Sequence, residues 1–300
     1  MYALIENDIK KLLAYSSIEN MGIIFLGLGG AELFLYLGAP AIAAMSLAAA
    51  LFHVVNHAIF KGALFLSAGN VVHATGTRSL EKLGGLVKLM PITAVGFLVG
   101  AMAVAAIPPL NGFASEWMIF QTFLNGAATA TGSARVAIVI VVAGLGLTGA
   151  LAASTFVKAF GIPFLAMPRS DNASSAKESS AWMTGPVIFL AALCVLLGLG
   201  SAKLIPYFLQ VSAGVFELPS AIPLSFESAT SFAGNSPFVP QFAALVLVAV
   251  LLALLVLFFL RRKNGSRRTG IWDCGYYTIT SRNEYTSTAF AKPFRLASAP

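Results

Sequence analysis

The sequence predicts an all-α polytopic membrane protein. Its 300 residues are 58% hydrophobic and only 10% charged, with a mean hydropathy of +0.84, which is far from the composition of soluble globular domains. Apolar runs recur along the chain, and several are long enough to cross the hydrocarbon core of a bilayer as a helix. We therefore expect about six or seven transmembrane helices, one of which is discontinuous.

The positive charge is concentrated near the C-terminus. Residues 261–300 carry eight Lys and Arg against Asp273 and Glu284, so this segment holds +6 of the net charge of +7. A basic cluster directly after an apolar helix is typical of a cytoplasmic stop signal, and we favour that interpretation over a nucleic-acid partner. The two cysteines, Cys194 and Cys274, lie in different environments and indicate neither a metal site nor a disulfide.

The N-terminal residues look like a loop between helices. Met1 is followed by Tyr-Ala-Leu-Ile-Glu-Asn-Asp-Ile-Lys-Lys instead of the basic and apolar segments of a signal peptide, so we expect a split or truncated gene product. Residues 12–35 then form one apolar span, interrupted by Glu19 and Asn20. We expect Glu19 to be buried or hydrated inside the bundle; the alternative is that it snorkels to the membrane interface.

The most informative stretch is a His-x3-His-x3-Lys pattern within the next apolar run, residues 41–70. In a helix, His53, His57 and Lys61 share one face, each about 6 Å further along the axis. A lysine at the centre of a membrane helix costs roughly 2.5–3.5 kcal/mol on insertion scales, so such groups face a bundle interior or a hydrated path. Because imidazole exchanges protons near neutral pH, we interpret the pattern as a proton relay. The alternative is that the histidines only donate hydrogen bonds to carbonyls while Lys61 snorkels.

A helix break is predicted at the end of the following apolar run, residues 91–107. Pro108 and Pro109 lack N–H donors and clash with the preceding turn, and Gly112 loosens the backbone. Broken helices at membrane depth are tolerated only where the freed backbone is buried in protein or lines a cavity, and such breaks are typical of the ion sites of transporters.

Glu116 lies beside this break and is the second expected proton site. It begins a short amphipathic piece, residues 115–124; the alternative is an ordinary interhelix loop with an interfacial Glu. Residues 71–89 are expected to form a polar loop. The sequence leaves open whether residues 88–125 make one broken crossing or two short ones.

The rest of the chain is predicted to contain three spans at 134–160, 183–202 and 242–260, a polar loop at 168–181 and an extracytoplasmic loop at 203–240. Lys158 lies in the last turn of the first of these spans, where it either snorkels and caps carbonyls or takes part in function. Counting back from a cytoplasmic tail, alternation places residues 162–181 inside and residues 126–133 outside.

In this order, these landmarks resemble the antiporter-like membrane subunits shared by respiratory complex I, multisubunit cation/proton antiporters and energy-converting hydrogenases. The loop that contains Asp8 and Lys10 is similar to the family's loop-to-helix motif. The His53-x3-His57-x3-Lys61 pattern, called the ladder below, matches the ladder in the second half of the family's fold. Ile107-Pro-Pro-Leu-Asn-Gly-Phe-Ala-Ser-Glu116 resembles its discontinuous helix. The tail, with Trp272-Asp-Cys-Gly-Tyr276, resembles the hydrogenase branch, to which hydrogenase-4 and formate hydrogenlyase membrane subunits belong.

The resemblance implies a fold of two inverted five-helix repeats, each with a broken helix and a half-channel for protons. Residues 1–165 would be the second repeat, residues 166–260 the C-terminal helices and residues 261–300 a cytoplasmic tail. It also implies partners, namely other membrane subunits of a hydrogenase- or complex I-like assembly, including the missing first repeat.

The expected function is that of a multi-pass inner-membrane subunit that relays protons in a hydrogenase complex. Its expected relay residues are Glu19, His53, His57, Lys61, Glu116 and Lys158. The sequence has no cysteine cluster and no glycine-rich nucleotide loop, so no cofactor or metal of its own is expected. Two alternatives stay open: a cation/proton antiporter or complex I subunit, and a membrane scaffold that does not transport.

Overall fold

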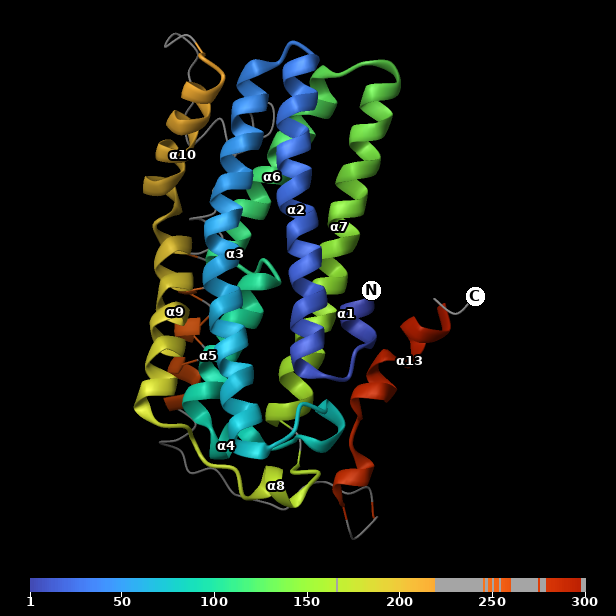
Figure 1. Ribbon diagram of the computed structural model, residues 1–300, viewed down its shortest axis with the longest axis vertical. Coiled ribbons are helices and arrows are strands. Elements are labelled where there is room, and N and C mark those ends of the chain that lie inside the picture. Colours follow the sequence, from blue (N-terminus) through green and yellow to red (C-terminus); the bar gives the residue numbers. More distant parts are fainter. Residues whose placement is uncertain are drawn as a thin grey trace.

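The structure is a computed structural model, and it describes residues 1–165, 167–218, 245, 248, 249, 251–253, 255–259, 275 and 279–297. In this part of the chain the fold is a bundle of helices that run along its long axis (Figure 1). The predicted all-α membrane fold is confirmed. The predicted span at 242–260 lies largely outside the described residues, as does most of the loop predicted at 203–240.

The elements are α1 (Tyr2–Ile5), α2 (Ile9–Tyr36), α3 (Pro40–Thr75), η1 (Leu80–Lys82), α4 (Leu86–Leu89), α5 (Pro91–Val104), α6 (Asn111–Thr129), α7 (Gly132–Phe160), the π-helix η2 (Gly161–Leu165), α8 (Asp171–Ser174), α9 (Ala181–Leu199), α10 (Ser201–Val215), η3 (Ser281–Asn283) and α13 (Ser287–Ala297). Among the described residues, four helices are long and apolar enough to cross a membrane, namely α2, α3, α7 continued by η2, and α9.

Helices α2 and α3 form an antiparallel pair at the centre of the bundle. Asp8 caps α2 by accepting hydrogen bonds from the backbone N–H groups of Lys10 and Lys11, as expected of an N-cap aspartate. The two helices approach closely where α2 has glycines, since a Cβ added at Gly27 would lie 2.9 Å from the Cβ of Ala50. Small residues at such contacts are typical of membrane helix pairs.

Helices α5 and α6 make one broken crossing beside α3 (Figure 1). Their residues meet α3 in steadily descending order: Gly96 lies beside Ser67, Gly100 beside Leu64, Gly112 beside Phe60, and Ser115 beside His53. The break between them contains the cis peptide Pro108–Pro109 and Ala106 with a positive φ of 51°. Two separate short crossings, which the sequence left open, are therefore excluded.

The structure corrects two boundaries around this crossing. The second half-helix is not the short piece 115–124 but the whole of α6, so Gly112 lies in its first turn and does not loosen a loop. A Cβ at Gly112 would lie 1.9 Å from the carbonyl oxygen of Ala103, so glycine is needed there for close packing. Residues 71–89 are also not simply a loop, because α3 continues to Thr75 and Gly76 then caps it in the left-handed region.

Helices α9 and α10 form a second interrupted column. The predicted span at 183–202 ends earlier, at Leu199, and the first part of the predicted extracytoplasmic loop, residues 203–215, instead belongs to the helix α10. This prediction was wrong because Lys203 and Pro206 make the segment look polar and irregular, whereas its Ile205 and Leu209 are buried. Phe208 packs on Phe52 of α3, with ring centroids 5.2 Å apart.

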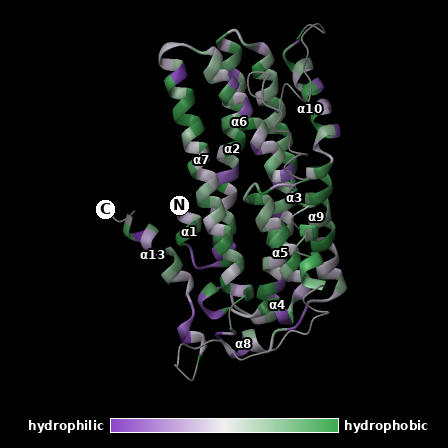
Figure 2. Cartoon of the chain, turned by 180° about the vertical axis from the view of Figure 1, so that it is seen from behind, coloured by the Kyte–Doolittle hydropathy of each residue, from purple (hydrophilic) through white to green (hydrophobic). Residues whose placement is uncertain are grey.

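The apolar core is divided into two clusters by a polar layer. On α2, one cluster ends at Leu13 and the other begins at Ile23. On α3 the corresponding limits are Phe60 and Phe52. The buried polar residues of this layer are Ser16 and Asn20 on α2, His53 and Asn56 on α3, and Asn111, Ser115 and Glu116 at the start of α6. Figure 2 shows the same pattern as isolated hydrophilic positions within otherwise hydrophobic helices.

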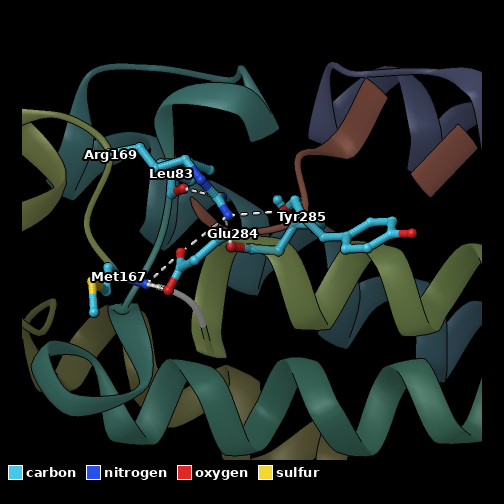
Figure 3. A network of polar contacts seen from close by, with 6 residues as sticks. Leu83, Met167, Arg169, Glu284 and Tyr285 are labelled. Carbon is cyan, nitrogen blue, oxygen red and sulfur yellow. Dashed lines mark hydrogen bonds and ion pairs between the residues drawn. The ribbon is translucent and has the colours of Figure 1, made fainter. Parts of the chain in front are cut away.

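A second polar cluster fastens the C-terminal segment to the bundle end that carries α4 and α8 (Figure 3). Arg169 donates to the carbonyl oxygens of Leu83 (2.9 Å) and Tyr285 (3.0 Å) and pairs with Glu284 at 3.4 Å. The Glu284 carboxylate also accepts from the backbone N–H of Met167 at 2.9 Å. Arg169 thus joins three segments that are distant in sequence.

Replacing Arg169 by alanine is expected to loosen the C-terminal segment. Hydrogen bonds to a charged group contribute about 1.5–3 kcal/mol each, so amide hydrogen exchange in α13 should become about tenfold faster or more. The control is Arg282→Ala, because the Arg282 side chain is exposed and forms no hydrogen bond or ion pair with another described residue. Unchanged exchange in the Arg169 variant, or equal acceleration in the control, would contradict this role.

Candidate functional site

The site is centred on Lys61, whose ammonium group is buried between α2, α3 and α7. Its side chain is only 5% exposed. The Nζ atom donates to the hydroxyl of Ser16 at 2.8 Å and to the carbonyl oxygen of Leu13 at 3.3 Å. It also lies 5.6 Å from the ring centroid of Phe156, within the range of a cation–π contact. Lys61 therefore does not snorkel; it points across the bundle to α2.

His53 joins α2 to α6. The imidazole is fully buried. Its Nε2 lies 3.2 Å from the Oδ1 of Asn20, and its Nδ1 lies 2.9 Å from the hydroxyl oxygen of Ser115. Asn20 in turn donates to the carbonyl oxygen of Ser16 at 2.8 Å. Lys61 and His53 are thus linked through one turn of α2.

The chain of hydrogen bonds continues to the helix break. Asn56 donates to the Ser115 hydroxyl and to the carbonyl oxygen of Asn111, each at 3.0 Å. The Asn111 amide donates back to Asn56 at 3.1 Å. These contacts hold the first turn of α6 against α3. Hydroxyl and imidazole groups both donate and accept hydrogen bonds and can pass a proton on, whereas the carboxamides orient them.

Two carboxylates flank this chain. Glu116 follows Ser115 and is 7% exposed, and Glu19 precedes Asn20 and is half-buried. Neither carboxylate accepts a hydrogen bond from a described residue. Glu19 interacts electrostatically with Lys61 and with Glu116. Glu19 is therefore the charge that connects the lysine to the glutamate beside the break.

His57 and Lys158 stand apart from the hydrogen-bonded chain. His57 lies between His53 and Lys61 on α3, edge-on to Phe60, and its buried Nε2 has no partner among the described residues. Lys158 is buried at the end of α7, where its Nζ donates to the carbonyl oxygens of Leu4 and Glu6, both at 2.7 Å. Lys158 therefore caps the end of α1 and does not snorkel.

The remaining predicted site residues lie at the ends of helices, outside the hydrogen-bonded chain. Asp8 is the N-cap of α2, and the backbone around it pairs with residues 78–80, since Ile9 N–H donates to the Arg78 carbonyl oxygen at 3.0 Å. Lys10 is half-buried in the first turn of α2. Pro108 and Pro109 lie in the break, directly before α6.

Three residues that hold the hydrogen-bonded chain between the helices were not predicted from the sequence. Ser16 and Ser115 bind the two ends of the chain, and Asn111 fixes the break to α3. A signal was present in their spacing, because Ser16 with Asn20 and Asn111 with Ser115 are i, i+4 pairs on otherwise apolar helix faces. Which helices these pairs would face could not be read from spacing alone.

Comparison with known proteins identifies the family. The model of the transmembrane family described as NADH:quinone oxidoreductase/Mrp antiporter matches residues 1–148. Those residues belong to this family. The match includes the ladder on α3, the helix break and Glu116, and so confirms the resemblance expected from the sequence motifs.

Curated proteins also match the chain beyond residue 148. Formate hydrogenlyase subunit 3 of Escherichia coli is 38% identical over 100% of this chain and 47% of its own length. Hydrogenase-4 component B of the same organism is 40% identical over 92% of this chain and 42% of its own length. The chain therefore spans about half the length of these curated relatives.

A solved structure has the same fold. The archaeal membrane-bound sulfane sulfur reductase complex contains a subunit that matches 96% of this chain and 48% of its own, with a TM-score of 0.64 at 20% identity. At that identity the likeness concerns the fold alone. The fold of that subunit thus extends over nearly all of this chain, including helices that follow residue 148, where the family match ends.

Proposed function

We propose that this chain is part of a proton-translocating membrane subunit of a respiratory or energy-converting hydrogenase complex. The observation that supports it is the buried chain of hydrogen bonds from Lys61 through Asn20 and His53 to Ser115, which ends beside Glu116 at the helix break. A charged and polar layer at mid-depth is costly and marks ion or proton pathways in membrane proteins. The similarity to hydrogenase-4 and formate hydrogenlyase subunits favours the hydrogenase class.

In this proposal, protons pass between Lys61 and Glu116 through water, the His53 imidazole and the hydroxyls of Ser16 and Ser115, because the Asn20 carboxamide between Ser16 and His53 orients its neighbours and cannot itself relay a proton. Glu19 interacts with both charges, so a change of protonation at either end alters the field at the other. The same proposal assigns His57 a place beside Lys61, with which it also interacts electrostatically. Lys158 would connect this axis to α1. Electron transfer would belong to other subunits.

The proposed setting is the inner membrane, with the α4–α8 end and the C-terminal segment on the cytoplasmic side. This end exposes the basic side chains of Lys11, Arg78, Lys82, Lys88 and Lys177. Of the carboxylates there, Glu81 accepts from the backbone N–H of Thr288 and Glu178 from that of Ile92, Glu284 pairs with Arg169, and Asp171 is exposed. The positive-inside rule therefore favours this orientation.

The proposed partners are other membrane subunits and polypeptide that corresponds to the unmatched half of the relatives. We place the half-channel in residues 1–165 and assign residues 166–260 and 261–300 to C-terminal helices and a cytoplasmic tail. A cation/proton antiporter subunit is the second candidate, because the matching family includes Mrp antiporters. Sodium or potassium flux across the membrane in the absence of a redox partner would distinguish an antiporter subunit from a hydrogenase subunit.

The test is replacement of Glu116 by glutamine in the assembled complex. Glutamine keeps the shape of the side chain but cannot ionise, so proton uptake coupled to hydrogenase turnover should fall about tenfold or more. Proton movement is measured in proteoliposomes with a pH-sensitive dye. Glu32→Gln is the matched control, since Glu32 is exposed on α2. Unchanged pumping in the Glu116 variant would favour a membrane scaffold instead.

A further inference from the structure

Lys158 is held by carbonyl oxygens at the end of a very short helix. Its side chain is 1% exposed although it lies in the last turn of α7, a place from which a lysine can extend its ammonium group to water. The two oxygens that bind its Nζ belong to Leu4 of α1 and to Glu6, which follows α1. A helix of one turn is not stable alone in water, so the position of Lys158 depends on what supports α1.

The C-terminal helix α13 packs against α1 (Figure 1). Asn7 joins the two helices, because its Oδ1 accepts from the buried hydroxyl of Ser287 at 2.7 Å and its Nδ2 donates to the hydroxyl oxygen of Thr288 at 3.0 Å. Asn7 directly follows Glu6, whose carbonyl oxygen binds Lys158. One carboxamide therefore lies between α13 and a group that holds Lys158.

The turn that contains Asn7 is internally bonded. The carboxylate of Glu6 accepts from the backbone N–H groups of Asn7 at 2.9 Å and of Asp8 at 3.0 Å. The carbonyl oxygen of Asn7 accepts from the N–H of Leu80 at 2.9 Å, and η1, to which Leu80 belongs, also packs against α13. Residues 6–8 therefore move as a unit, and the support that α13 gives to Asn7 reaches the Glu6 carbonyl oxygen.

Charged groups at both ends of α13 also act on Lys158. Glu81 accepts from the backbone N–H of Thr288 at 2.6 Å, and Arg295 lies in the last turn of α13. Both side chains interact electrostatically with Lys158, as does Glu6. A displacement of α13 would therefore change the charge around Lys158 as well as the support of its hydrogen-bond acceptors.

We infer that Asn7 is a positioning residue through which the C-terminal helix α13 holds Lys158 at α1. With α13 in place, α1 closes Lys158 off from the water at the α4–α8 end. With α13 displaced, α1 loses this support and Lys158 becomes accessible to water. For its role in transport the inference rests on the proposed function, because it concerns when a relay lysine is open to that water.

The experiment is acylation of lysines in the purified complete complex by a water-soluble N-hydroxysuccinimide ester. Mass spectrometry follows the acylation rate of Lys158 relative to that of Lys177, which is exposed. Lys158 should be protected in the wild-type complex. Because Asn7→Ala removes both side-chain hydrogen bonds to α13, the relative rate should rise about tenfold. The backbone hydrogen bonds of position 7 are kept, so the variant should fold.

The conservative replacement and a matched asparagine provide the controls. Asn7→Asp keeps an acceptor for the hydroxyl groups of Ser287 and Thr288, so it should restore most of the protection of Lys158. Asn172→Ala also removes a carboxamide that bonds two segments at this end of the bundle, since Asn172 of α8 donates to the Thr75 carbonyl oxygen at 3.1 Å. It should leave Lys158 protected.

A variant outside α1 tests whether α13 itself is responsible. Arg169→Ala removes the bonds to Glu284 and Tyr285, which precede α13, and should also raise the acylation rate of Lys158. If Asn7→Ala accelerates amide exchange in α13 while Lys158 stays protected, Asn7 only anchors α13 and the inference is overturned. Equal acylation rates in Asn7→Ala and Asn172→Ala would overturn it as well.

Proton uptake by the same complexes completes the test. Uptake per hydrogenase turnover should fall in Asn7→Ala and recover in Asn7→Asp. Normal uptake in Asn7→Ala with an exposed Lys158 would overturn the role in transport. Acylation does not require transport, so the two ideas fail separately. Lys158 that stays protected in every variant contradicts only this inference, whereas the expected acylation rates together with normal uptake in Glu116→Gln contradict only the proposed function.

Discussion

Replacing Lys61 by methionine is expected to reduce coupled proton transport by the complex about a hundredfold, the range in which a positioned proton-transfer group contributes. Lys61 is the cation at one end of the hydrogen-bonded chain through α2, and methionine has no proton to exchange. The measurement is the rate of proton uptake into proteoliposomes per turnover of the hydrogenase. Lys177→Met is the control, because Lys177 is exposed at the α4–α8 end.

The same variant should stay folded, which separates transport from stability. The groups bonded to Lys61 are neutral oxygens, and the Leu13 carbonyl also accepts a hydrogen bond from Ser17 at 3.0 Å. No described carboxylate lies within salt-bridge distance of Lys61, and removing the lysine also removes the free-energy cost of keeping an ammonium group buried. The melting temperature should therefore not fall. Wild-type pumping in Lys61→Met would contradict the relay.

Much of the fold follows from hydropathy because long apolar runs in a membrane leave only one structure that satisfies their backbone. The span predicted at 12–35 is α2, and that at 134–160 is most of α7. The short helix that follows the interruption after α9 was not predicted from hydropathy. Helix α10 carries Lys203 and Pro206, and its burial depends on contacts with α3 that hydropathy does not encode.

The candidate site was predicted in part. The spacing of His53 and Lys61 indicated a shared helix face, and the two prolines indicated the break. The partners of these residues could not be predicted, because Asn20 and Ser115 reach His53 from two other helices. Lys158 was also predicted to be a relay residue, and its hydrogen bonds lie at α1, apart from the hydrogen-bonded chain that includes His53.

Replacing Gly198 by alanine is expected to disturb the site from a distance, because the two helix interruptions are interlocked. A Cβ at this position in α9 would lie 2.0 Å from the carbonyl oxygen of Pro109 and 2.8 Å from the backbone nitrogen of Asn111. Both neighbours are backbone atoms and cannot rotate away. Forced overpacking of this kind costs about 1–3 kcal/mol, which should appear as a lower melting temperature in detergent.

Gly185→Ala is the matched control on the same helix, since a Cβ there meets nothing within 4 Å, and it should be neutral or stabilising by up to about 1 kcal/mol. In Gly198→Ala the break has to move away from α9, and with it Asn111 and Ser115, which hold Asn56 and His53. Proton transport should therefore fall more than stability alone explains. If Gly198→Ala lowered the melting temperature but each folded complex still pumped protons normally, the first turn of α6 would not position the relay. If Gly198→Ala and Gly185→Ala had the same melting temperature and the same transport rate, the two helix interruptions would not be interlocked.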